Sequence, residues 1–193
     1  MNAAAPLAHA DLETITMLRD SAADFCRRSL EVGRLRALRG ARPAFDRALW
    51  GEMCELGWAG ILAPESAGGL GLGAAAVGAV CRELGRVLAP EPMLECGVGA
   101  VSLLAACDAQ ALLTEVIGGG RVLVCALAEE AEFTARAPGG LKARKLDDGY
   151  LLSGAVGDVP LATDADGYLL PARLGEDVAL FHCPRETMVV ERI

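Results

Sequence analysis

The sequence predicts an α+β fold, in which an N-terminal all-helical domain over residues 1–120 precedes a partial antiparallel β-barrel-like domain over residues 121–193. In the first part, apolar residues recur at three- and four-residue intervals, the spacing of one buried helix face. From residue 121 the pattern changes to short β-branched or alternating runs between turn residues, which indicates strands. Because the helices come before the strands and do not alternate with them, two segregated halves are expected.

The helical half divides at its prolines and glycines. Pro43 suits the first turn of a helix and Gly57 suits its end. Ala89-Pro90-Glu91-Pro92 interrupts the pattern later, because proline does not continue a helix. The pattern predicts five helices, over residues 12–30, 45–56, 77–88, 93–106 and 108–117.

The second half reads as short strands. Asp147-Asp148-Gly149 is a hairpin turn signal between two of them. Since the given sequence stops within or just after a strand, we expect an open sheet edge there. The expected strands cover residues 121–127, 141–146, 150–153, 168–171, 178–182 and 188–191.

Composition narrows the function classes. A chain of 193 residues with 53% hydrophobic residues can bury a substantial core. Its net charge of −8 argues against a nucleic-acid partner, which needs clustered positive charge. Its seven cysteines form no Cys-x-x-Cys pair, and its two histidines have no partner at metal-ligand spacing. Without a signal peptide or a membrane-span pattern, a cytoplasmic protein with no metal and no membrane partner is expected.

A glycine-rich stretch over residues 57–73 separates the second and third expected helices. Gly69-x-Gly71-x-x-Ala74 formally matches a dinucleotide fingerprint, but that motif works only between a strand and a helix. A tight helix-to-helix loop, with glycines that permit close packing, is the favoured interpretation.

Three motifs around this stretch resemble the N-terminal part of the acyl-CoA dehydrogenases. They are Trp50-x-x-Met53-x-x-Leu56-Gly57-Trp58, Pro64-Glu65-x-x-Gly68-Gly69-x-Gly71 and Arg82-Glu83-Leu84-Gly85-Arg86. The resemblance implies an oxidoreductase of lipid metabolism that uses FAD to desaturate an acyl-CoA thioester between its α and β carbons. The resemblance covers only the N-terminal half of a typical family member.

The resemblance also implies flavin contacts in the second half. The first lies on the first strand, at Ala126, Leu127 and Ala128, in a segment where the family carries Ala-Leu-Thr-Glu-Pro. The other lies in residues 154–166, where Asp158 aligns with an aromatic residue against the flavin ring and Pro160 with a hydroxyl that bonds the ring.

For the substrate, the resemblance implies that Met93, Leu94 and Val98 line an acyl-chain tunnel, positions that equally suit ordinary core. An arginine group could hold a phosphate-bearing ligand such as coenzyme A, although a solvated helix face and loop is favoured. The group consists of Arg27, Arg28, Arg34, Arg36, Arg39 and Arg42.

The resemblance assigns the catalytic base to a carboxylate of a C-terminal domain, which we expect to be absent here, so the catalytic residues are unknown. We therefore expect little or no dehydrogenase activity from this polypeptide alone. The alternative is a non-catalytic subunit or interaction module that pairs with a complete partner, in a homo- or hetero-oligomer. A flavin monooxygenase-type relative with the same fold remains open as well.

Overall fold

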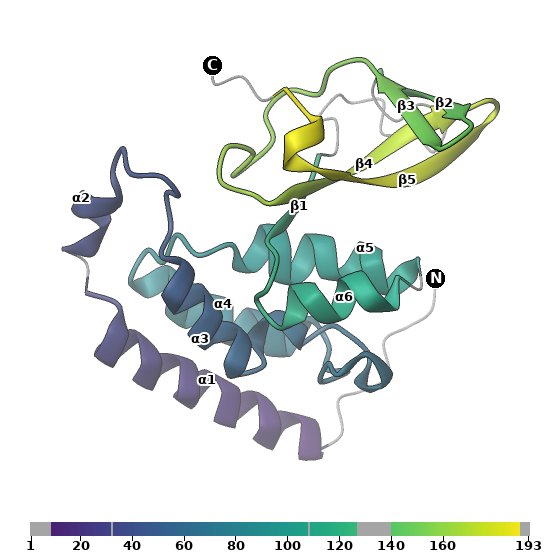
Figure 1. Ribbon diagram of the computed structural model, residues 1–193. Helices are drawn as coiled ribbons and strands as arrows, with labels where there is room; N and C mark the ends of the chain where they lie inside the picture. Colours follow the sequence, from purple (N-terminus) through teal and green to yellow (C-terminus); the bar gives the residue numbers. More distant parts are fainter. Residues whose placement is uncertain (1–8, 32, 108, 127–139, 190–193) are drawn as a thin grey trace. The chain divides into compact units, whose positions relative to one another are not determined.

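The computed structural model describes residues 9–31, 33–107, 109–126 and 140–189. The chain divides into two compact units, Met1–Gly120 and Arg121–Ile193, which are described separately (Figure 1). The first is helical and the second holds one sheet, which confirms the α+β class.

The helical unit contains the expected helices, with the fourth in two parts. Its first half, η3, is a π-helix that the apolar spacing does not distinguish from an α-helix. Helix α2 was not expected, because it buries no residue and therefore leaves no apolar period in the sequence. The expected cap at residue 108 lies outside the described residues. The helices are α1 (His9–Ser29), α2 (Arg34–Leu38), α3 (Arg47–Glu55), α4 (Ala74–Arg86), η3 (Met93–Ala100), α5 (Val101–Ala106) and α6 (Gln110–Ile117), with 3-10 turns η1 (Trp58–Gly60) and η2 (Glu65–Ala67).

Aromatic side chains hold the centre of this unit. Phe25 of α1 meets Trp58 of η1 edge to face, with ring centroids 5.2 Å apart. Trp50 and Met53 of α3 are buried with them. Residues from three elements separated in sequence thus form one core.

The glycine-rich stretch folds back on itself between α3 and α4. Leu70 N–H donates to Gly60 O at 2.9 Å, and Gly71 N–H donates to Ala63 O at 2.8 Å. A Cβ atom at Gly69 would lie 2.2 Å from Ala63 O, so only glycine fits there. The packing interpretation is confirmed, because the loop connects helices α3 and α4, the 3-10 turn η2 and not a strand precedes Gly69, and the loop is closed by its own backbone.

The sheet unit is built around β4. Strand β5 pairs antiparallel with β4 along its whole length, so β1 and β2 share the opposite edge of β4, and both run parallel to it. Strand β3 is antiparallel to β2. The strands are β1 (Leu123–Cys125), β2 (Lys142–Leu146), β3 (Gly149–Ser153), β4 (Gly167–Leu174) and β5 (Asp177–Pro184).

Two details of the sheet correct the expectations. The sheet is mixed and not antiparallel throughout, because only β2–β3 and β4–β5 are joined by tight turns, whereas longer connections allow parallel neighbours. Met188 and Val189 are not in a strand, although a strand was expected over residues 188–191. A 3-10 turn, Arg185–Thr187, follows β5 and bends the chain, with Arg185 N–H donating to Asp166 O at 3.1 Å.

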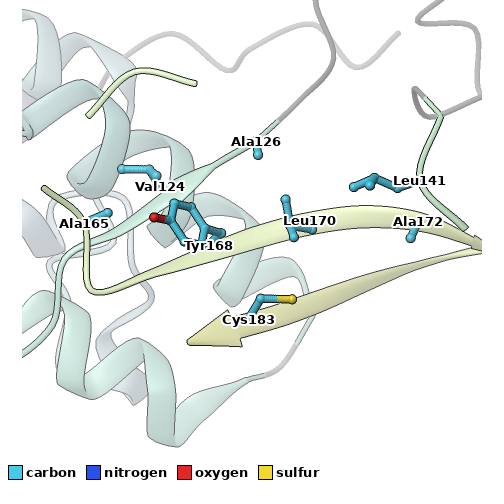
Figure 2. Packing of buried hydrophobic residues seen from close by; sticks show 8 residues of the cluster. All are labelled: Val124, Ala126, Leu141, Ala165, Tyr168, Leu170, Ala172 and Cys183. Carbon is cyan, nitrogen blue, oxygen red and sulfur yellow. The ribbon is translucent and has the colours of Figure 1, made fainter. Parts of the chain in front are cut away.

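One apolar cluster forms the core of the sheet unit (Figure 2). It joins side chains from β1, β4 and β5 with three residues from the connecting segments. Its buried members are Val124, Ala126, Leu141, Ala165, Tyr168, Leu170, Ala172 and Cys183. Residues 154–166, the segment with predicted flavin contacts, pack against this cluster through their apolar side chains.

Candidate functional site

Ala126, the residue that follows β1, is the member of the first predicted flavin-contact segment that the structure describes. Its N–H donates to Leu169 O at 3.1 Å, and its side chain is buried in the apolar cluster (Figure 2). Leu127 and Ala128 lie outside the described residues. The backbone of β1 therefore fixes one end of the candidate site.

The second candidate segment, residues 154–166, crosses the same cluster. Val159 and Leu161 are half-buried and pack against the cluster that contains Ala126. Between and beside them, Asp158 and Pro160 are exposed. Both predicted flavin-contact segments therefore contact the same apolar cluster, whereas residues 158 and 160 face solvent.

The end of this segment is held by side chains that the sequence pattern did not signal. Tyr168 Oη donates to Ala162 O at 2.6 Å, and Arg185 Nη1 donates to the same carbonyl at 3.1 Å. The carboxylate of Asp166 accepts from Val122 N–H at 2.7 Å. Burial raises the pKa of Tyr168, so its hydroxyl stays a donor at neutral pH. No local motif could reveal Tyr168 and Arg185, because they meet the segment only in three dimensions.

The residues present do not fit a flavin ring. An exposed carboxylate at 158 would repel the negative charge that a flavin gains on reduction. Pro160 has neither a hydroxyl nor an N–H to bond the ring. Asp158 also has a φ of 52°, which a bulky aromatic residue would adopt only with strain. The apolar cluster beneath this segment is present, but residues 158 and 160 do not offer the ring contacts that the resemblance implies.

The three predicted acyl-contact residues lie on η3 but differ in their surroundings. Met93 is 3% exposed, whereas Leu94 is 61% exposed and Val98 is half-buried. A Cβ at Gly97 would lie 3.2 Å from Met93 Sδ and 3.4 Å from Ala59 Cα, so Met93 belongs to the core. Leu94 and Val98 are the members that solvent can reach.

One arginine of the predicted group has a buried partner. Arg34 Nη1 and Nη2 each lie 2.8 Å from a carboxylate oxygen of Glu91, in a bidentate pair. The Glu91 side chain is 0% exposed and that of Arg34 is 17% exposed. Asp46 N–H also donates to Glu91 at 3.4 Å. Glu91 thus connects α2, the start of α3 and the turn before η3. The local sequence, in which Glu91 lies between Pro90 and Pro92, does not indicate that Arg34 is its partner.

Two kinds of feature are absent from the described residues. In the ranges that the structure covers, no helix is long and apolar enough to cross a membrane. Within the same ranges, no group of three or more His, Cys, Asp or Glu side chains could hold a metal ion.

Comparison with known proteins places this arrangement in a family. The family model described as "Acyl-CoA dehydrogenase, N-terminal domain" matches residues 13–111. The chain therefore belongs to the acyl-CoA dehydrogenase family. Acyl-CoA dehydrogenase IpdE2 of Mycobacterium tuberculosis is 32% identical over 149 residues, which are 76% of this chain and 41% of that protein.

Two solved structures are similar to this chain in both fold and sequence. A variant of the Tcur3481–Tcur3483 steroid ACAD is 33% identical with a TM-score of 0.77, over 90% of this chain and 48% of that one. The ChsE4–ChsE5 complex of Mycobacterium tuberculosis is 30% identical with a TM-score of 0.76, over 89% and 47%. The chain spans about half the length of the relatives it matches.

Proposed function

We propose that this chain is one subunit of an acyl-CoA dehydrogenase assembly that desaturates an acyl-CoA thioester with FAD. In this proposal a partner chain supplies the flavin-binding side chains and the catalytic base. The observation that carries it is the pair of exposed residues, Asp158 and Pro160, at the positions that would meet a flavin ring. The names of the two similar structures, each joining two chains, support a partner.

We assign this chain's own share of the site to η3. Leu94 and Val98 lie four residues apart on this helix and present apolar surface that an acyl chain can cover. Met93 supports them from the core. A π-helix is rare and often occurs at functional positions, which favours η3 over the regular helices as the acyl contact.

We also propose a cytoplasmic location for the assembly. All seven cysteines are free, which suits a reducing compartment.

The first experiment is a visible absorption spectrum of the purified chain, before and after addition of FAD and desalting. The proposal expects no retained flavin band in the wild-type chain. A band retained at one flavin per chain would contradict a partner-supplied flavin site.

The second experiment purifies the tagged chain from its native host and assays desaturation with a dye as electron acceptor. Straight-chain and steroid acyl-CoA thioesters are both offered, because one similar protein is called a steroid ACAD. Activity is expected only in fractions that contain a second chain at fixed stoichiometry. In that complex, Leu94→Ala should raise KM for the acyl-CoA, with the exposed Leu56→Ala as the control. Full turnover by the chain alone would overturn the proposal.

A further inference from the structure

We propose that residues 33–42, here called the basic arm, form a docking surface for an acidic segment of a partner protein. The basic arm comprises α2 with the residues on either side of it. The proposal rests on the proposed function for the existence of a partner, and it adds the chemistry of the contact.

Charge is distributed unevenly along this chain. Residues 27–47 contain seven arginines against two acidic residues, Glu31 and Asp46, a local net charge of +5. Since the whole chain carries −8, the remaining residues carry −13. A cationic segment in an otherwise acidic protein attracts acidic partners and steers their encounter.

The basic arm is ordered without being part of the core. Helix α2 has five residues, none of them buried, and a helix this short is not stable by itself in water. In Figure 1 it lies at the margin of the helical unit, away from the packed helices. Its first residue, Arg34, is held by the fully buried Glu91 carboxylate. The fold therefore fixes the base of the basic arm and leaves the rest of α2 on the surface.

Some arginines of this region have partners within the fold. Arg34 pairs with Glu91, Arg27 pairs with Asp24, and the Arg47 guanidinium lies 5.5 Å from the centre of the Phe45 ring. Arg36 and Arg39 are exposed. They are three positions apart, so both lie on one face of the helical turn.

This arrangement favours an extended acidic surface over a small phosphate ligand. A small anion such as coenzyme A needs several donors that converge in a concave and partly dry site. Arg36 and Arg39 instead project from an exposed turn that buries nothing. Exposed charges of this kind act through complementarity with a second charged surface and are screened by salt.

The test measures binding of a fluorescent poly-glutamate peptide to the full chain by anisotropy, at low and at physiological salt. The double variant Arg36→Glu, Arg39→Glu should weaken binding by about tenfold or more at low salt. The matched control, Arg82→Glu with Arg144→Glu, makes the same change in net charge at two exposed arginines outside the basic arm. It should change binding by less than about twofold.

Each other outcome has a defined meaning. No binding of the peptide, or equal losses in both double variants, would overturn the proposal, because net charge alone would then account for the data. Displacement of the peptide by coenzyme A at an affinity above the peptide's own would also overturn it, in favour of a phosphate site. Arg36→Gln with Arg39→Gln provides a second variant if the charge reversals disturb folding. Flavin retention does not enter this assay, so its result is separable from that of the proposed function.

Discussion

Two connecting segments of this protein differ in how the fold holds them. Residues 57–73 in the helical unit are closed by their own backbone hydrogen bonds, and Gly69 has no room for a side chain. Residues 154–166 in the sheet unit rest on an apolar cluster but expose Asp158 and Pro160, and a Cβ at Gly157 would meet open space. The packed segment has no room for an added atom at Gly69, whereas exposed positions of the second segment can change without disturbing the fold.

The largest loss of stability is expected from breaking the buried Arg34–Glu91 ion pair of the helical unit. Arg34→Ala leaves the Glu91 carboxylate buried without its partner and should lower the free energy of unfolding by about 3–5 kcal/mol. Arg36→Ala, two residues away and exposed, should change it by less than about 0.5 kcal/mol. Urea unfolding of both variants checks this, and similar losses would show that Glu91 does not need Arg34.

The two segments can be compared directly through one methyl group. Gly69→Ala should cost about 1–3 kcal/mol or more, because its Cβ would collide with the Ala63 carbonyl. Gly157→Ala should cost less than about 0.5 kcal/mol, since nothing lies within 4 Å of the added atom. Thermal unfolding monitored by circular dichroism measures both. Equal costs would remove the distinction between a packed and an open connection.

The helical core should also respond to alkaline pH. Burial, with the neighbouring Cys96 adding to it, raises the pKa of the Cys54 thiol to about 12. Above a pH of about 9 the unfolded chain loses this proton while the folded chain keeps it, so stability falls as pH rises. The expected slope is about 1.4 kcal/mol per pH unit for this thiol.

Urea midpoints measured from neutral to alkaline pH check this slope. Cys54→Ala should make the pH dependence shallower, even though it also lowers stability at neutral pH. Cys107→Ser, at an exposed thiol, should leave the slope unchanged. An unchanged slope in Cys54→Ala would mean that this thiol already ionises in the folded state.

The smallest effect is expected in the exposed segment. Asp158→Asn should change the free energy of unfolding by less than about 0.5 kcal/mol, because the side chain is exposed and asparagine tolerates the φ of 52° at this position. The deeper neighbour Val159, which packs on the cluster, is the contrasting position, and Val159→Ala should cost more. Urea unfolding distinguishes them, and a loss above about 1 kcal/mol for Asp158→Asn would show that the segment is anchored through the residue 158 carboxylate.

The comparison also explains which parts of the fold could be predicted. Apolar spacing located α1, α3 and α4, because a helix that buries one face must repeat that spacing. It could not locate α2, which buries nothing, or separate the π-helix η3 from α5. It located most of the strands but not their order, because strand order depends on connections that leave no periodic signal.

The candidate site was predicted to a similar extent. The family pattern singled out Ala126, Asp158 and Pro160, and the structure places their segments on one apolar cluster. It gave no sign of Tyr168 and Arg185, which both bond the Ala162 carbonyl. These contacts join residues that are close only after folding.

The sequence by itself determined the class of fold, the acyl-CoA dehydrogenase pattern and the departures from it at residues 158 and 160, because these depend on residue identity and spacing. Only the tertiary structure decided that Glu91 is the buried partner of Arg34 and that Met93 belongs to the core while Leu94 is exposed. It alone also decided the strand order, in which β4 has β5 on one side and both β1 and β2 on the other. The physical reason is that burial, ion pairing and strand order are relations between distant residues, which local spacing does not encode.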